Sequence, residues 1–145
     1  MTDYAVTIVL GYVMGSLPGG LIVGYLWLRR DIRAAGSGET GTTHVLRTAG
    51  EIPAGLVMIL DVAKGAVPAL VGRLVFDNDG AAVAGACASV VGHIWPVFAG
   101  FRGGRGVAST YGGVLGLAPL VSLGFPVIGA VLVIATRYVS VMSVV

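Results

Sequence analysis

The fold is decided by the stretch YAVTIVLGYVMGSLPGGLIVGYLWL, residues 4–28, which contains no charged side chain. A helix needs about 20 apolar residues to cross a hydrocarbon core of about 30 Å, so this run can span a membrane. The glycines and proline of residues 15–20 predict a kink or the close approach of a second helix. Because Asp3 and no basic segment precedes the run, we expect a retained helix rather than a cleaved signal peptide.

The composition places the rest of the chain in the same class. The 145 residues are 56% hydrophobic and 11% charged, with a mean hydropathy of +0.93, whereas soluble domains carry about 25% charged residues. We therefore expect a single membrane domain over residues 1–145. The one cysteine, Cys87, lies in an apolar run, so neither an internal disulfide nor a metal site is predicted. We expect no cofactor, and the sequence has no nucleic-acid-binding signature.

Three further apolar segments follow, at residues 52–74, 81–98 and 106–136. As one helix, the last segment would be about 45 Å long at 1.5 Å per residue. Pro119 and the Gly-Phe-Pro group at residues 124–126 favour two short spans, although one long, tilted and kinked helix is the alternative. The sequence therefore predicts an all-α integral membrane protein, a polytopic helical bundle of about five transmembrane spans.

The placement of arginines predicts the orientation of this bundle. Arg29, Arg30 and Arg33 directly follow the first span, and loops rich in Arg and Lys usually stay in the cytoplasm. We therefore expect an extracytoplasmic N-terminus and cytoplasmic glycine-rich loops. Residues 77–80, Asp-Asn-Asp-Gly, predict a turn on the outer side.

The longest polar interval is GSGETGTTHVLR, residues 36–47. Its glycines let backbone N–H groups approach an anion, its hydroxyls donate hydrogen bonds, and Arg47 supplies a cationic fork. Thr42 or Thr43 is expected to cap a short helix that Gly50 ends, which would point free N–H groups into the loop. The interval is predicted to bind phosphate; the alternative is a plain flexible connection.

A second loop, RGGRG at residues 102–106, repeats this chemistry. Between the loops, Asp61 and Lys64 share one face of a predicted membrane helix, where charges usually serve a function. The alternatives are a pair that merely neutralises itself, or an interfacial helix with a wet polar face. His93 lies near the end of the next span, where Pro96 should end or bend the helix.

Acyltransferases that pair a histidine with an aspartate five residues later are excluded, because Ala49 and Phe98 occupy those positions after His44 and His93. Several blocks instead resemble the bacterial membrane glycerol-3-phosphate acyltransferases that use acyl phosphate as donor. The blocks are GSLP at residues 15–18, DIR at 31–33, GSGETGTTHVLR at 36–47, DVAKG at 61–65, GHIWPVF at 92–98, GGRGVA at 103–108 and, more weakly, RYVSVMS at 137–143.

The resemblance implies a reaction in which the 1-hydroxyl of glycerol 3-phosphate attacks a long-chain acyl phosphate, giving lysophosphatidic acid and phosphate. It implies catalytic roles for Ser37 and His93, with the base being either His93 or the phosphate of the donor. It also implies a multi-pass protein of the bacterial inner membrane with its active site on the cytoplasmic face. The expected partners are glycerol 3-phosphate, acyl phosphate and membrane lipid. The implied substrate- and phosphate-binding residues are Gly38, Thr43, Arg47, Lys64, Gly104, Arg105 and Ser140, with Ser143 as the alternative to Ser140.

The chain departs from the family pattern at four positions. Glu39 and His44 stand where the family usually has Asn, Thr42 replaces a common Ala, and Arg105 replaces a usual Lys. Family members also usually continue through about two more helices. Two other functions remain open on the residues alone: a transporter or binding module for a phosphorylated small molecule, and a relative that binds lipid precursors without turnover.

Overall fold

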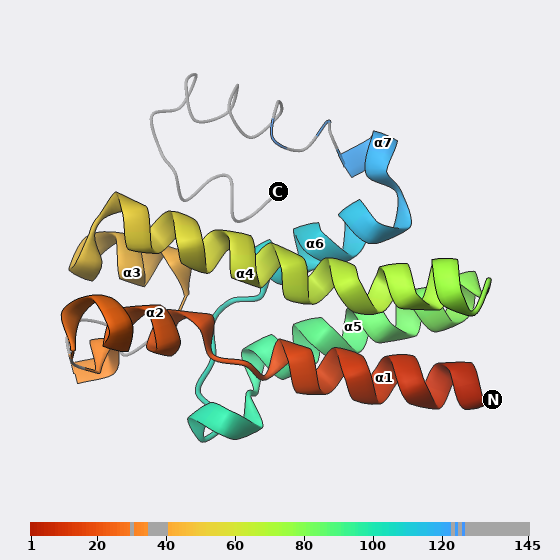
Figure 1. Ribbon diagram of the computed structural model, residues 1–145, viewed down its shortest axis with the longest axis horizontal. Helices are drawn as coiled ribbons and strands as arrows, with labels where there is room; N and C mark the ends of the chain where they lie inside the picture. Colours follow the sequence, from red (N-terminus) through yellow and green to blue (C-terminus); the bar gives the residue numbers. More distant parts are fainter. Residues whose placement is uncertain (30, 35–40, 123, 125, 127–145) are drawn as a thin grey trace.

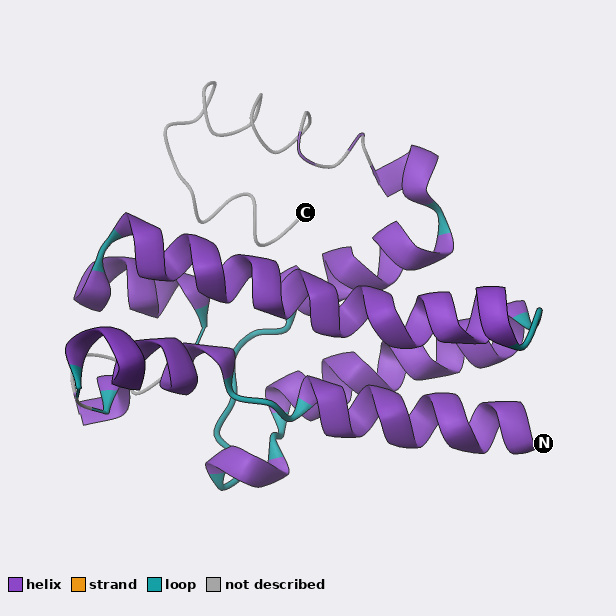
Figure 2. Cartoon of the chain, in the orientation of Figure 1, coloured by secondary structure: helices purple, strands orange, loops and turns teal. Residues whose placement is uncertain are grey.

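The computed structural model describes residues 1–29, 31–34, 41–122, 124 and 126, and every regular element within them is helical (Figures 1 and 2). Beside the longer helices lie two short 3₁₀ turns, η1 and η3, and one π-helical turn, η2. The elements in chain order are α1 Thr2–Gly15, α2 Gly19–Leu28, η1 Ile32–Ala34, α3 Thr42–Ala49, α4 Glu51–Leu70, η2 Val71–Val75, α5 Asp79–Ile94, η3 Val97–Ala99, α6 Val107–Leu117 and α7 Pro119–Ser122.

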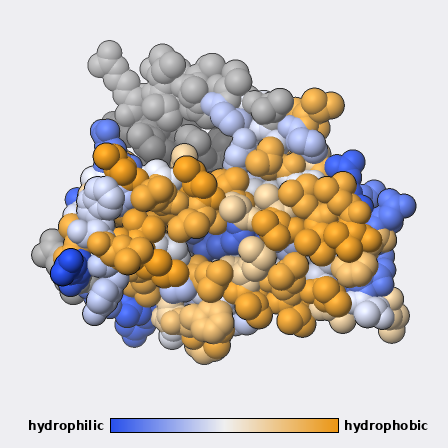
Figure 3. Space-filling view, in the orientation of Figure 1, coloured by the Kyte–Doolittle hydropathy of each residue, from blue (hydrophilic) through white to orange (hydrophobic). Residues whose placement is uncertain are grey.

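Within these residues, three helical segments are long and apolar enough to cross a membrane: Thr2–Leu28, Glu51–Val75 and Asp79–Ala99. Helix α6 is apolar but shorter. Large hydrophobic side chains cover most of the face shown in Figure 3, as expected for a surface solvated by lipid. The all-helical membrane class is confirmed, while the number of about five spans stays a prediction.

Three of the predicted interruptions occur where glycine and proline placed them. Helix α1 ends at Gly15 and α2 begins at Gly19, so the first apolar run is broken as expected. Helix α5 ends at Ile94, before Pro96, and α6 gives way to α7 at Ala118. The turn predicted at residues 77–80 is shorter than expected, because Asp79 and Gly80 already belong to α5, whose N-cap is Asn78.

One predicted detail is wrong. Neither Thr42 nor Thr43 caps α3; the N-cap is Gly41, and no side chain caps the helix. The reason is that the chain turns one residue earlier, so that the Gly41 carbonyl already accepts hydrogen bonds from the N–H groups of His44 and Val45. The helix ends as predicted at Gly50, whose φ of 94° suits glycine.

Glycines let the long helices pack backbone to backbone. Gly11 of α1 lies against Gly85 of α5, and Gly15 lies against Ser89, so these helices run in the same direction. In the same way Gly65 of α4 lies against the Ser109 carbonyl of α6. A Cβ at Gly11, Gly15 or Gly65 would collide with backbone of the neighbouring helix. Membrane helices use this close packing in place of hydrophobic burial.

Helix α4 runs opposite to α1 and α5 along the length of the molecule (Figure 1). The connections that follow α2 and α5 therefore emerge on the same side of the bundle. Gly41 of the first connection lies beside Gly104 of the second, with a Cβ built on Gly104 only 3.4 Å from the Gly41 Cα atom. The fold thus brings together two glycine-rich segments that are far apart in the sequence.

Candidate active site

The site is centred on the break between α1 and α2, where the middle of α4 passes. Lys64 Nζ lies 2.8 Å from Asp61 Oδ1 and donates a hydrogen bond of 3.2 Å to the Leu17 carbonyl oxygen within the break. Asp61 is 2% exposed and Lys64 is 6% exposed. An unpaired charge at such depth is very unfavourable, so each side chain depends on the other. Because both side chains are buried, they do not form the water-exposed polar face of an interfacial helix, which was one alternative from the sequence.

His93 reaches the same place from the last turn of α5. Its Nδ1 atom lies 3.6 Å from Asp61 Oδ1. This Nδ1 atom has no hydrogen-bond partner among the described residues. Ser89, one turn earlier, donates a 2.7 Å hydrogen bond to the Lys64 carbonyl and ties α5 to α4. A small pocket lies where the break, α4 and the end of α5 meet. Its lining residues are Gly15, Leu17, Pro18, Gly19, Asp61, Lys64, His93 and Pro96.

The second glycine loop is fastened to the end of α5 beside this pocket. The N–H groups of Gly103 and Gly104 donate to the carbonyls of Ile94 and His93, each at 3.2 Å. A Cβ built on Gly104 would lie 2.5 Å from His93 Nε2. Only glycine lets the loop approach the imidazole this closely. The Nε2 edge of His93 therefore faces the loop, and the Nδ1 edge faces Asp61.

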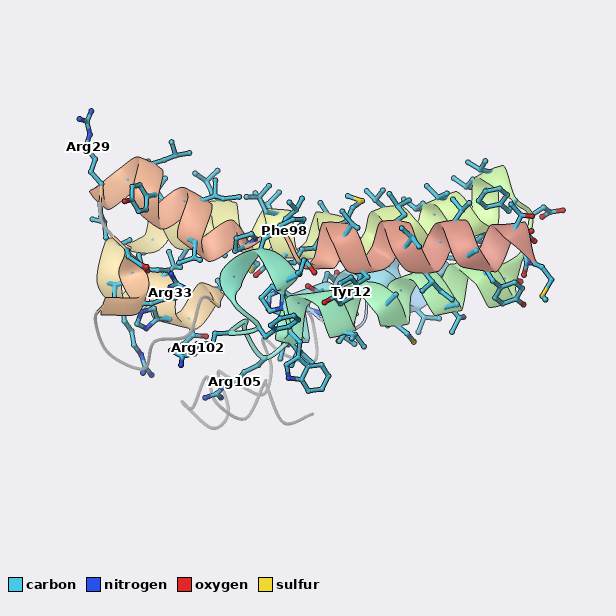
Figure 4. The ribbon with its side chains drawn as sticks, turned by 90° about the horizontal axis from the view of Figure 1, so that it is seen from below. Tyr12, Arg29, Arg33, Phe98, Arg102 and Arg105 are labelled. Carbon is cyan, nitrogen blue, oxygen red and sulfur yellow. The ribbon has the colours of Figure 1, made fainter. Side chains whose placement is uncertain are left out.

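The structure brings together three of the predicted site residues, Lys64, His93 and Gly104. Thr43 and Arg47 lie one helical turn apart on α3 and are exposed, as is Arg105. Figure 4 shows Arg33, Arg102 and Arg105 toward the same end of the molecule, the end occupied by α2 and α3. The predictions for Ser37, Gly38 and Ser140, with its alternative Ser143, fall on residues outside the described part of the chain.

The sequence placed Asp31 and Arg33 in a matching block but did not predict their contacts. Arg33 donates two hydrogen bonds to the Asp31 carboxylate, from Nε to Oδ1 at 3.1 Å and from Nη2 to Oδ2 at 2.7 Å. These hydrogen bonds lower the pKa of the Asp31 carboxyl and raise the pKa of the Arg33 guanidinium. Arg33 Nη1 also reaches the Ala99 carbonyl of η3 at 3.5 Å. Arg33 and Asp31 therefore connect η1 with η3.

His44, one of the departures from the family pattern, has a structural contact. Its Nε2 atom donates a 2.8 Å hydrogen bond to the buried carbonyl of Ile32, which joins α3 to η1. Val23, Val45 and Val57 pack around this corner from α2, α3 and α4. Over the described residues, no three His, Cys, Asp or Glu side chains gather in a group that could hold a metal ion.

The chain is similar to proteins of known name over almost its whole length. The family model described as glycerol-3-phosphate acyltransferase matches residues 5–145. A glycerol-3-phosphate acyltransferase of Rubrobacter xylanophilus is 44% identical over 138 residues, which cover 95% of this chain and 69% of the relative. One of Thermoanaerobacter pseudethanolicus is 42% identical over 142 residues, which cover 97% and 71%.

Two solved structures of PlsY, an integral membrane glycerol 3-phosphate acyltransferase, share the fold. The glycerol 3-phosphate form gives a TM-score of 0.89 at 35% identity and covers 97% of this chain and 70% of that chain. The lysophosphatidic acid form gives 0.87 at 34% identity, covering 97% and 69%. Both similarities extend across the helices that carry Lys64 and His93.

Proposed function

Because this chain belongs to the glycerol-3-phosphate acyltransferase family, we propose that it transfers a fatty acyl group from acyl phosphate to the 1-hydroxyl of glycerol 3-phosphate. The products are lysophosphatidic acid and inorganic phosphate, as in the first step of phospholipid synthesis. The structural observation that carries the proposal is that Gly104 lies against the buried His93 and that Gly41 lies beside Gly104. Gly41 of the first glycine-rich segment and Gly104 of the second therefore lie side by side next to the imidazole that Gly104 contacts.

The chemistry requires positioning more than covalent help. In the transfer, the hydroxyl oxygen bonds to the acyl carbon, the bond from that carbon to the phosphate oxygen breaks, and the hydroxyl proton leaves. An acyl phosphate is already an activated mixed anhydride, so orientation and charge neutralisation can supply most of the rate. The proton passes either to His93 Nε2, which faces the loop, or to the leaving phosphate of the donor.

The phosphate groups of glycerol 3-phosphate and of acyl phosphate each need positive charges and hydrogen-bond donors, which the residues predicted from the sequence can supply. We propose that Thr43 and Arg47 bind phosphate from one exposed face of α3 and that Arg105 does so from the second loop. Lys64 would add a buried positive charge beside the pocket. Ser37 would hold the reacting groups, and Gly38, Gly104 and Ser140 would complete the phosphate sites.

The location of the site fits a substrate with one polar and one lipid end. Both connections emerge on one side of the bundle; they carry Arg29, Arg33, Arg102 and Arg105, and α3 adds Arg47. By the positive-inside rule this side faces the cytoplasm, with the N-terminus on the other side and about five spans in the inner membrane. The acyl chain of acyl phosphate would lie among membrane lipids while its phosphate reaches the loops.

The direct test is product formation in membranes that contain the chain, given acyl phosphate and labelled glycerol 3-phosphate. Labelled lysophosphatidic acid should form, and His93→Ala and Ser37→Ala should each lower the rate by about 100-fold or more. Cys87→Ala, at an exposed position on α5, is the matched control and should keep the full rate. Equal product from acyl coenzyme A would contradict the choice of donor.

The transporter alternative has one observation in its favour, the Asp61–Lys64 pair buried within a membrane-capable helix. It predicts saturable uptake of a phosphorylated molecule into proteoliposomes without an acylated product. The position of both glycine-rich segments on one side of the bundle weighs against alternating access.

A further inference from the structure

The two nitrogens of His93 face different surroundings. Nδ1 lies 3.6 Å from Asp61 Oδ1, whereas Nε2 faces the loop at Gly104. The imidazole is 6% exposed, so bulk water reaches little of it. Which nitrogen carries the proton therefore depends on the groups that the fold places around the ring.

We propose that Asp61 is a positioning residue for His93, holding the imidazole with Nδ1–H toward its carboxylate and the Nε2 lone pair toward the glycine loop. Asp61 does not line the loop itself and acts through the histidine. The kinetic part of this inference rests on the acyltransferase function proposed above, whereas the tautomer it assigns does not.

The chemistry of the two groups favours this arrangement. An ionised carboxylate only accepts hydrogen bonds, and a neutral imidazole has one N–H and one lone pair. With the proton on Nε2, the Nδ1 lone pair would face a negative oxygen within a buried site. With the proton on Nδ1, the same contact becomes attractive. The distance of 3.6 Å exceeds a hydrogen bond, but such contacts commonly tighten only when substrate is bound.

The surroundings of Asp61 hold its carboxylate in place. Lys64 lies 2.8 Å away on the same helix and is itself held by the Leu17 carbonyl in the break of the first helix. Ser89 of α5 bonds to the Lys64 carbonyl and sets the distance between the two helices at the level of His93. Among the described residues, the charged and titratable groups that meet here are Asp61, Lys64 and His93. Within that set, the Asp61 carboxylate pairs with the Lys64 ammonium and faces the His93 imidazole.

The arrangement has a consequence for the transfer reaction. A lone pair on Nε2 can accept the hydroxyl proton of glycerol 3-phosphate, or accept a hydrogen bond that orients this hydroxyl. In the other tautomer Nε2 would present an N–H and could do neither. Asp61 thereby selects the acceptor form of His93 without touching the substrate.

The tautomer can be measured directly by ¹⁵N NMR of protein labelled at histidine, because the chain holds only two histidines. The His44→Asn variant assigns the remaining signals to His93. We expect the wild-type protein to show His93 protonated at Nδ1, and Asp61→Asn to shift it toward the Nε2–H form. A wild-type His93 protonated at Nε2 would overturn the proposal without any need for a variant.

Kinetics supply the second measurement. Asp61→Asn should lower kcat by about 10- to 100-fold, as removal of an orienting partner commonly does, with little change in KM for glycerol 3-phosphate. In a His93→Ala background the same change should cause no further loss. Multiplying losses would show that Asp61 acts independently of His93 and would reject the proposal.

Two controls keep these outcomes separable. Should Asp61→Asn destabilise the protein by leaving Lys64 unpaired, the double variant Asp61→Asn/Lys64→Met removes both charges and should show the same change of tautomer. An unchanged tautomer in that double variant would count against Asp61. Failure of the wild-type protein to form lysophosphatidic acid would refute the proposed function and leave the tautomer measurement standing.

Discussion

Two regions of the molecule bury a histidine to the same extent and surround it differently. His44 and His93 are each 6% exposed. His44, in the corner between α3 and η1, donates to a backbone carbonyl at a normal hydrogen-bond distance of 2.8 Å. His93, at the end of α5, has an unbonded Nδ1 atom near a carboxylate that is already paired with a lysine.

The difference separates a histidine whose hydrogen bond joins two elements from the one for which we propose a part in the reaction. A backbone carbonyl has no rotamers and does not titrate. The hydrogen bond from His44 to the Ile32 carbonyl therefore holds η1 and α3 together in one arrangement. The Asp61 carboxylate instead acts on the ring of His93 through charge, and the opposite edge of that ring faces the loop. Burial alone would not distinguish the two residues; their neighbours do.

The largest expected effect comes from breaking the charge pair beside His93. Lys64→Met leaves Asp61 buried without its cation and should lower the free energy of unfolding by about 3–5 kcal/mol. Asp61→Asn/Lys64→Met, which removes both charges, should recover most of that loss. Reversible unfolding in detergent micelles measures both variants. A loss below about 1 kcal/mol in the single variant would mean that the pair is solvated rather than buried.

A smaller effect is expected in the neutral corner. His44→Ala removes one hydrogen bond to a buried carbonyl and should lower the free energy of unfolding by about 1–3 kcal/mol. His44→Asn keeps an N–H donor and should restore part of this stability, in agreement with the asparagine usual in the family. The same unfolding measurement tests both variants, and equal losses for Ala and Asn would argue against the hydrogen bond as the reason for a histidine here.

The smallest effect should come from the half-exposed Asp31–Arg33 pair, which joins η1 to η3. Arg33 lowers the pKa of Asp31 below its ordinary value of 3.8. Its contribution to stability is therefore full above about pH 4 and is lost as the pH falls through the lower pKa of the folded state. Asp31→Asn should be slightly less stable than the wild-type protein at pH 7, and the two should converge in acid. A difference that grows in acid would reverse the sign of this argument.

Much of the helical framework could be predicted from the sequence. The lengths of the apolar runs predicted the membrane-capable helices, because the bilayer fixes the length that a helix needs. Pro18 and Pro96 predicted where helices break, since proline lacks the N–H that a helix uses. The N-cap of α3 was misplaced by one or two residues, because Gly41 and the two following threonines are all plausible caps and the local sequence does not choose among them.

The candidate site was predictable in its parts but not in its contacts. Charged side chains inside an apolar run singled out Asp61 and Lys64, and glycines with arginines singled out the two loops. The approach of Asp61 to His93 was not foreseen, although both lie in the recognised motifs. Ser89 gave no signal, because a serine in a small-residue helix looks like any other packing position.

The sequence by itself determined that this protein is built from apolar helices, where those helices break, and which family it belongs to. These properties depend on residue type and local order along the chain. Only the tertiary structure decided which edge of His93 meets a carboxylate and which edge meets the loop. That outcome depends on how closely α4 and α5 pack and on how near Gly104 can come, which the glycines along the helices permit but do not specify.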